Sequence, residues 1–187
     1  MREDLVGKSQ RGDGQAFREL VGPMQTALYN LALRILGDRE EARDVVQEAL
    51  TTGWLSLPQL RRRDTFQSWL YRIAVNLAKN RARAMRRKAT AELDDNVVRL
   101  SGSDDPEASA IDRENMQRLR SELLKLNVDL RLAVVLRDVN ELSYAEIGDV
   151  LGIPDGTVRS RISRARSELR RRLNSLGGAA AKGGVET

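Results

Sequence analysis

The chain has 187 residues, a formal net charge of +5 at pH 7, and neither cysteine nor histidine. This composition excludes disulfides, cysteine or histidine zinc sites, thiol nucleophiles and histidine acid–base catalysis, and no glycine-rich phosphate loop occurs. Its apolar runs are far shorter than the ~20 residues of a membrane span, and its first residues are unlike a signal peptide. We therefore expect a cytoplasmic protein without membrane insertion that is not an enzyme and that uses no cofactor or metal.

The first 88 residues follow helical spacing. We predict two short helices within residues 1–22, a helix over 24–36, a helix over 39–57, a loop over 57–65 and a long helix over 66–88. In the helix over 39–57, the apolar residues expected to face inward are Ala42, Val45, Val46, Ala49 and Leu50. In the helix over 66–88, the expected buried face is Phe66, Leu70, Ile73, Ala74 and Leu77. These elements form a first domain, residues 1–88.

The remaining chain divides by composition. Residues 89–113 hold seven acids against two arginines, so we predict a flexible acidic linker over 89–112. A second helical domain is expected over 113–175, and a disordered tail over 176–187. The predicted fold class is all-α, with two small helical domains joined by this linker and a helix-turn-helix in the second.

The helix-turn-helix is predicted from local signals over residues 143–172. Ser143 and Glu146 have capping-box spacing, and Gly152 is suited to end the helix that they begin. Pro154 cannot continue that helix, and Asp155 is a good N-cap for the next one. These signals indicate that the protein binds duplex DNA.

The second helix of this motif has two contrasting faces. Its expected buried stripe is Val158, Ile162, Ala165 and Leu169. Serines and arginines point the other way and suit contacts with bases and phosphates. An amphipathic helix with a solvated basic face is the alternative, and we prefer the helix-turn-helix because turn, caps and face agree.

Two further surfaces stand out in the first domain. Residues 61–88 hold ten Lys/Arg against one acid, and phosphate-binding cations and base-reading asparagines share one face of the helix over 66–88: Arg72, Asn76, Lys79, Asn80, Arg83 and Arg87, with Trp69 at its border. Residues 38–48 instead hold five acids against two arginines. Such an acidic face repels DNA and attracts a basic protein surface.

The chain resembles the extracytoplasmic-function (ECF) sigma factors of bacterial RNA polymerase, in the sigma-70 family. The resemblance is carried by Asp44-Val-Val-Gln-Glu48, Phe66-x-x-Trp-Leu-Tyr-Arg-Ile-Ala-Val-Asn76, Leu142-Ser-Tyr-x-Glu-Ile147 and Gly156-Thr-Val-Arg-Ser-Arg161. It implies a factor that directs promoter-specific initiation, recognises −35 and −10 elements and promotes DNA opening. The implied partners are the RNA polymerase core through the clamp helices of its beta-prime subunit, promoter DNA as duplex and melted strand, and an anti-sigma factor.

The resemblance also assigns residues by position. Contacts with the −10 element are expected from Leu60, Arg61, Arg62, Phe66, Trp69, Arg72, Asn76, Lys79, Asn80 and Arg83. Contacts with the −35 element are expected from Arg137, Thr157, Arg159, Ser160, Ser163 and Arg164. Contacts with the polymerase core are expected from Asp44, Gln47 and Glu48.

The chain departs from the family pattern at several positions. Leu60 stands where an aromatic is common, Arg62 where glycine is usual, and Asn127 where a proline commonly opens a helix. The first two departures concern the −10 preference, and the third concerns a turn. The alternative function is a helix-turn-helix transcription regulator whose N-terminal domain serves in dimerisation or sensing. The basic, asparagine-bearing helix over 66–88 argues against it.

Overall fold

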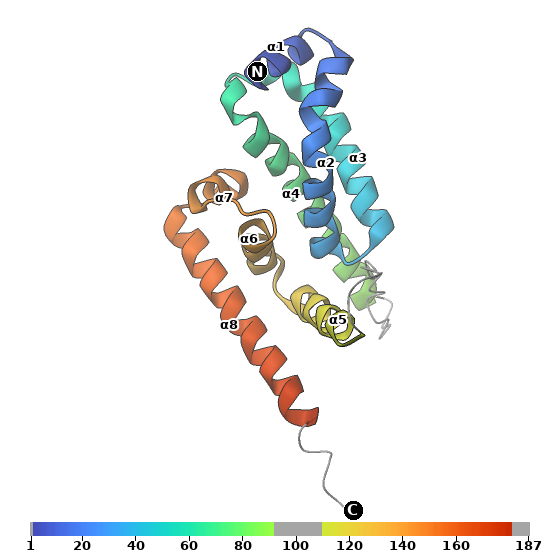
Figure 1. Ribbon diagram of the computed structural model, residues 1–187, viewed down its shortest axis with the longest axis vertical. Coiled ribbons are helices and arrows are strands. Elements are labelled where there is room, and N and C mark those ends of the chain that lie inside the picture. The colour runs from blue at the N-terminus through green and yellow to red at the C-terminus, as the bar shows by residue number, and fades with distance from the viewer. Residues whose placement is uncertain (1, 92–109, 181–187) are drawn as a thin grey trace, which may run out of the picture.

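The computed structural model describes residues 2–91 and 110–180, and every regular element in these ranges is helical. The prediction of an all-α fold is confirmed. In chain order the elements are α1 (Arg2–Gln10), α2 (Gly14–Leu36), α3 (Arg39–Ser56), the 3₁₀ turns η1 (Leu57–Gln59) and η2 (Arg63–Thr65), α4 (Phe66–Ala91), α5 (Ala110–Lys125), α6 (Val128–Asp138), α7 (Tyr144–Leu151) and α8 (Asp155–Ala180). Figure 1 shows α1–α4 in one half of the molecule and α5–α8 in the other.

Helix α2 runs without a break through Pro23, whereas the sequence predicted separate helices on either side of it. That prediction is wrong because buried residues keep helical spacing on both sides of the proline: Phe17, Leu20, Met24 and Leu28. Pro23 itself is exposed. Water can therefore bond the backbone carbonyl that the missing proline N–H leaves free.

Helix α3 begins at the cap residue Asp38, whose carboxylate accepts hydrogen bonds from the N–H groups of Glu40 (2.8 Å) and Glu41 (2.9 Å). Three of its five residues expected to face inward are buried: Ala42, Val45 and Ala49. The other two, Val46 and Leu50, are only partly buried, because they line a groove between α2 and α3.

Helix α4 is longer than predicted and more widely buried. Ile73 and Leu77 are only partly buried, which corrects their expected place in the core. The buried residues of α4 are Phe66, Leu70, Tyr71, Ala74, Val75 and Ala78. The buried face of α4 differs from the predicted one because α4 packs on α2 and α3 with one side and on α7 and α6 with another.

The helix-turn-helix forms as predicted. The capping box between Ser143 and Glu146 has both of its hydrogen bonds, and Gly152 ends α7 with a left-handed φ of 66°. One detail differs, because α8 begins at Asp155 and the carbonyl of Pro154 accepts from the N–H groups of Thr157 (2.8 Å) and Val158 (3.1 Å). Asp155 therefore lies in the first turn of α8 rather than at its N-cap.

Asn127, which stands where a proline was expected to open a helix, caps the start of α6. The side chain of Asn127 caps α6 by accepting from the N–H of Asp129 (2.9 Å). Asparagine is among the best N-cap residues, so α6 begins normally although residue 127 is not a proline.

The buried stripe of α8 is Val158, Ile162 and Ala165, while Leu169 is half-buried.

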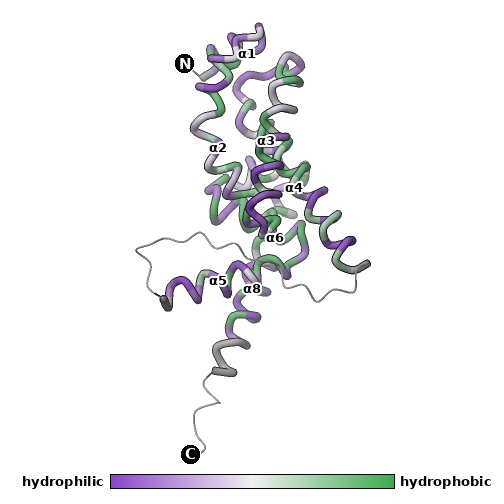
Figure 2. Tube along the Cα trace, turned by 90° about the vertical axis from the view of Figure 1, so that its right-hand side faces the viewer, coloured by the Kyte–Doolittle hydropathy of each residue, from purple (hydrophilic) through white to green (hydrophobic). Residues whose placement is uncertain are grey.

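The two halves pack against each other around a shared hydrophobic core. In Figure 2 the hydrophobic segments gather where α2, α4 and α6 come together. Arg131 of α6 is buried and donates to the carbonyls of Ile35, Leu124 (2.5 Å) and Leu126 (3.0 Å). Burial, with a smaller effect of Arg86, lowers its pKa to about 10, so it remains charged at neutral pH. Asn140 adds a bond to the carbonyl of Ala27 (3.0 Å).

The predicted linker and tail fall largely outside the described residues. Residues 89–91 and 110–112, assigned to the linker, belong to the ends of α4 and α5, and residues 92–109 lie outside the described ranges. Helix α8 continues to Ala180 through residues where a disordered tail was expected to begin, and residues 181–187 are not described. Within the described ranges, no helix is both long enough and apolar enough to cross a membrane.

Candidate nucleic-acid interface

Helix α4 carries most of the predicted −10 residues on one side. Arg72, Asn76, Asn80 and Arg83 are exposed, and Trp69 and Lys79 are half-buried. Phe66 is different: it is only 1% exposed and its ring packs 5.8 Å from that of Trp69, centroid to centroid. This corrects the predicted DNA contact of Phe66, whose place is in the core beneath the aromatic border of the face.

The loop before α4 presents charged side chains to solvent. Arg61 and Arg62 are exposed and Leu60 is half-buried. Arg62 forms an ion pair with Asp64 (2.6 Å), and the carbonyl of Arg62 accepts from the hydroxyl of Thr65 (2.7 Å). The hydrogen bond from Arg62 holds the pKa of Asp64 below its usual value. The loop is therefore ordered around Arg62.

The second domain covers part of the α4 face that carries the predicted −10 residues. Arg72 donates to the backbone carbonyl of Asp149 in α7, and Lys79 forms an ion pair with Asp129 of α6 (2.6 Å). Arg161 of α8 lies 4.0 Å from the same carboxylate. Burial raises the pKa of Asp129, but Lys79, Arg161 and nearby Arg83 outweigh this effect and lower it overall. In this arrangement two cations of the predicted −10 face are engaged by protein.

Helix α8 keeps its predicted DNA-reading residues largely accessible. Arg159, Ser163 and Arg164 are exposed, and Thr157 and Ser160 are half-buried. The hydroxyl of Ser160 donates to the carbonyl of Thr157 (3.0 Å), a bond within the first turns of the helix. The predicted −35 surface is thus open while the two domains are packed together.

Tyr144 is a residue of this surface that the sequence prediction missed. The guanidinium carbons of Arg137 and Arg159 lie 5.3 and 5.2 Å from the centre of its ring, within the range of cation–π attraction. Arg137 also donates to the carbonyl of Leu142 (2.9 Å). One aromatic ring thereby organises two of the predicted −35 arginines. Its aromatic side chain at the exposed first turn of α7 was the available sign.

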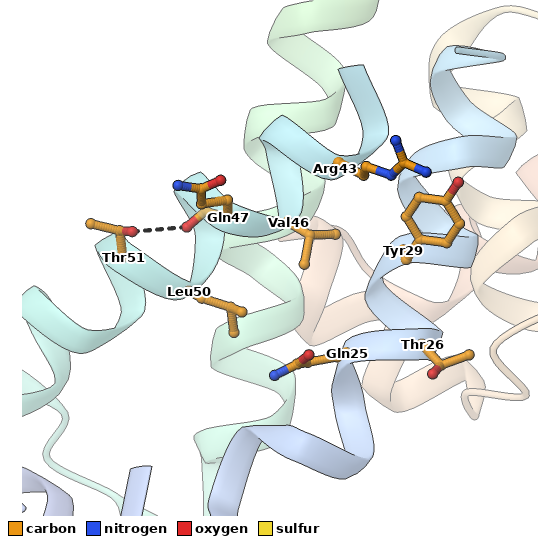
Figure 3. Close-up of a pocket in the computed structure, with 8 residues that line it drawn as sticks. All are labelled: Gln25, Thr26, Tyr29, Arg43, Val46, Gln47, Leu50 and Thr51. Carbon is orange, nitrogen blue, oxygen red and sulfur yellow. Dashed lines mark hydrogen bonds between the residues drawn. The ribbon is translucent and has the colours of Figure 1, made fainter. Parts of the chain in front are cut away.

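The predicted polymerase-binding residues lie beside a groove between α2 and α3. Asp44, Gln47 and Glu48 are exposed on one side of α3. Figure 3 shows the groove, whose volume is about 480 Å³; its lining is Gln25, Thr26, Tyr29, Arg43, Val46, Gln47, Leu50 and Thr51. Two of the five acids in residues 38–48 bond within the first domain: Asp38 caps α3, and Glu41 forms an ion pair with Arg81 (3.0 Å). The sequence had not revealed the apolar floor of this surface.

The described residues hold no group of three or more histidine, cysteine, aspartate or glutamate side chains arranged to bind a metal ion. The surface described above combines exposed cations, amides and aromatics. Such groups can bind phosphates, base edges and unstacked bases.

Comparison with known families explains both halves. Residues 20–88 match sigma-70 region 2, and residues 116–169 match sigma-70 region 4. The ECF RNA polymerase sigma factor SigW of Bacillus subtilis (strain 168) is 35% identical over 186 residues, which cover 94% of this chain and 98% of that protein. The chain belongs to the ECF sigma factor family. The RNA polymerase sigma-H factor of Pseudomonas aeruginosa is 37% identical over 182 residues, covering 93% of this chain and 94% of that one.

A solved structure supports the same assignment. CnrH, in complex with the cytosolic domain of CnrY, matches this ECF sigma factor with a TM-score of 0.70 and 26% identity, over 92% of this chain and 97% of that one. This sigma factor is therefore a promoter-directed transcription initiation factor. The alternative of a regulator with a dimerisation or sensing domain does not fit, because residues 20–88 match sigma-70 region 2.

Proposed function

We propose that the two domains divide promoter recognition between them, with residues 113–175 binding the −35 duplex and residues 1–88 reading and opening the −10 element. The observation that carries this proposal is the pairing of two DNA-suited surfaces on separate domains. Helix α8 exposes Arg159, Ser163 and Arg164, and α4 exposes Asn76 among cations. The first surface suits major-groove readout and the second suits a melted strand.

At the −10 element, Asn76 and residues 60–65 of the loop are proposed to hold a base flipped from the opened strand. Flipping costs a few kcal/mol, which contacts to the base and to the phosphates must offset. Asn76 supplies a donor and an acceptor, and Arg61, Arg62 and Arg83 supply exposed charge. The sigma factor itself needs no catalytic chemistry for this step, and we propose that it has no enzymatic activity.

The groove between α2 and α3 is the proposed docking site for the polymerase core. Asp44, Gln47 and Glu48 would contact the clamp helices of the beta-prime subunit, while Val46 and Leu50 offer an apolar floor. Charge at the rim with partly buried apolar residues at the centre is typical of protein–protein interfaces. We further propose that the protein acts in the cytoplasm.

An anti-sigma factor is a proposed further partner. The solved relatives include CnrH in complex with the cytosolic domain of CnrY and the sigma factor RpoE in complex with the anti-sigma factor NepR from Bartonella quintana. The RpoE structure matches this chain with a TM-score of 0.66 and 25% identity, over 84% of this chain and 96% of that one.

Transcription with reconstituted polymerase tests the residue roles. Asn76→Ala should impair opening at a cognate promoter and leave core binding intact, because Asn76 lies on α4, away from the groove. Reversing Asp44 and Glu48 to lysine should weaken core binding at least tenfold by repulsion from a basic surface. The matched control reverses Glu19 and Glu114, whose side chains lie on α2 and α5. Unchanged opening in the first variant, or unchanged core affinity in the second, would remove the corresponding role.

A further inference from the structure

We propose that Gln10 and Gly7 of α1 are positioning residues for the loop 57–65 and thereby influence which −10 sequence the sigma factor prefers. This inference rests on the proposed role of the loop in −10 recognition. Helix α1 lies outside the segment, residues 20–88, that matches sigma-70 region 2. It is held in the first domain by Val6, which is fully buried.

The side-chain amide of Gln10 bonds to three points of the loop. Its Nε2 donates to the backbone carbonyls of Leu57 (3.2 Å) and Leu60 (2.8 Å). Its Oε1 accepts from Nε of Arg63 (3.1 Å). An amide satisfies both needs at once because it carries two donors beside an acceptor. A carboxylate at this position could accept the hydrogen bond from Arg63 but could donate to neither carbonyl.

The loop has few bonds that could replace these. The N–H of Leu60 donates to Leu57 (3.0 Å), and the N–H of Thr65 donates to Arg62 (3.3 Å). These bonds shape the turns η1 and η2 separately and do not join one turn to the other. Gln10 contacts the first residue of η1, the residue that follows η1 and the first residue of η2, so it connects the two turns through α1. Leu60 is itself one of its contact points, and Arg61 and Arg62 lie between Leu60 and Arg63.

Gly7 allows the approach of Arg63. A Cβ atom at Gly7 would lie 2.9 Å from Nη1 and 3.0 Å from Cζ of Arg63, closer than side-chain atoms normally pack. The guanidinium of Arg63 therefore lies across the backbone of α1 at the place where the helix lacks a side chain. An alanine here would displace the flexible end of Arg63 while favouring the helix itself, since alanine has the higher helix propensity.

The test compares Gln10→Glu, Gly7→Ala and the control Gln15→Glu in the full-length protein. Gln15 is exposed on α2, where its side chain bonds to Glu19 and Arg18, so its variant makes the same charge change away from the loop. Each variant, with core polymerase, selects active promoters from a library randomised in the −10 and −35 elements. Core affinity, melting temperature and amide hydrogen exchange of Leu60 and Thr65 are measured in parallel.

Gln10→Glu should reduce the base preference at the −10 positions read by the loop about five- to tenfold, the effect of losing one or two net hydrogen bonds. Its −35 preference and core affinity should stay within about twofold, and the amides of Leu60 and Thr65 should exchange faster. Gly7→Ala should change the −10 preference in the same sense, about two- to threefold, without a lower melting temperature. Gln15→Glu should match the wild type.

Three outcomes would overturn the inference. An unchanged −10 profile in Gln10→Glu means that Gln10 does not position the reader. An even loss of stability and activity without a change in base preference means that its role is structural only. The variant Leu60→Ala separates the two proposals: if it alters the −10 preference and Gln10→Glu does not, positioning alone fails. If it leaves the preference unchanged, the loop does not read the −10 element and both fail.

Discussion

Replacing Asp129 with asparagine should loosen the contact between the two domains. The change removes one negative charge that faces Lys79 at 2.6 Å and Arg161 at 4.0 Å. It nearly preserves side-chain volume, so it creates little cavity. The backbone cap that Asn127 provides to α6 is also untouched, because Asn127 bonds to the N–H of residue 129.

The expected effect is about 1–2 kcal/mol. Lys79 and Asp129 are 29% and 28% exposed, which places the pair between exposed ion pairs, worth about 0–1 kcal/mol, and buried ones, whose disruption costs about 3–5 kcal/mol. The ratio of packed to separated molecules should therefore fall about 5- to 30-fold. Asp4→Asn is the matched control, since Asp4 also lies in a first helical turn and pairs with a lysine, Lys8, at 3.2 Å.

Single-molecule energy transfer can measure this ratio, because a chain without cysteine accepts two specific labels through Thr52→Cys and Ser167→Cys. Both positions are exposed, in α3 and α8. Asp129→Asn should also raise affinity for a −10 single strand more than for a −35 duplex, because the packed domains cover part of the α4 face and leave the α8 surface open. A packed fraction equal to that of Asp4→Asn would refute this reasoning.

Tyr144→Leu should weaken binding to a −35 duplex by about 1–2 kcal/mol through loss of two cation–π contacts, whereas Tyr144→Phe should not. In an Arg159→Ala background the effect of Tyr144→Leu should be smaller. Equilibrium titrations that give the same loss in both backgrounds would contradict the stacking role. Leu50→Asp should lower core affinity at least tenfold in competition binding, while Leu55→Asp, altering a side chain 71% exposed on the same helix, should not. The hydrogen bond from the Ser143 side chain, followed by the one from its backbone, lowers the pKa of Glu146. The stabilisation that ionised Glu146 gives to the folded protein is therefore present above about pH 4.3 and lost as pH falls through the folded pKa. In thermal unfolding measured against pH, Glu146→Gln should lack this pH-dependent part of the stability.

Much of the fold could be predicted because its signals are local. Ser143, Glu146 and Gly152 each act within a few residues, and the structure has the capping box and the left-handed turn that they indicate. The boundary at Pro23 was predicted wrongly because a proline on an exposed side breaks only one solvent-accessible bond. Ile73 and Leu77 were misplaced because periodicity identifies an apolar face but not how many neighbours a helix has.

The parts of the site that could not be predicted join distant positions. The contact of Lys79 with Asp129 and the bonds of Gln10 to the loop depend on how helices pack, which a single sequence does not encode in any local pattern. Tyr144 lies in the sequence motif 142–147, but its two arginine partners come from α6 and α8. Apart from the corrected contact of Phe66, the residue-level DNA and polymerase contacts, and the division into residues 1–88 and 113–175, remain predictions.

The position of the α2–α3 groove has a thermodynamic consequence for activation. The groove is accessible while α4 is packed against α6 and α7. A ligand that binds two conformations equally well shifts neither, however tightly it binds. Docking that contacts only this groove, and binds the packed and separated conformations equally, therefore cannot separate the domains; the free energy for separation must then come from contacts made only afterwards, on the uncovered side of α4 or on the freed second domain.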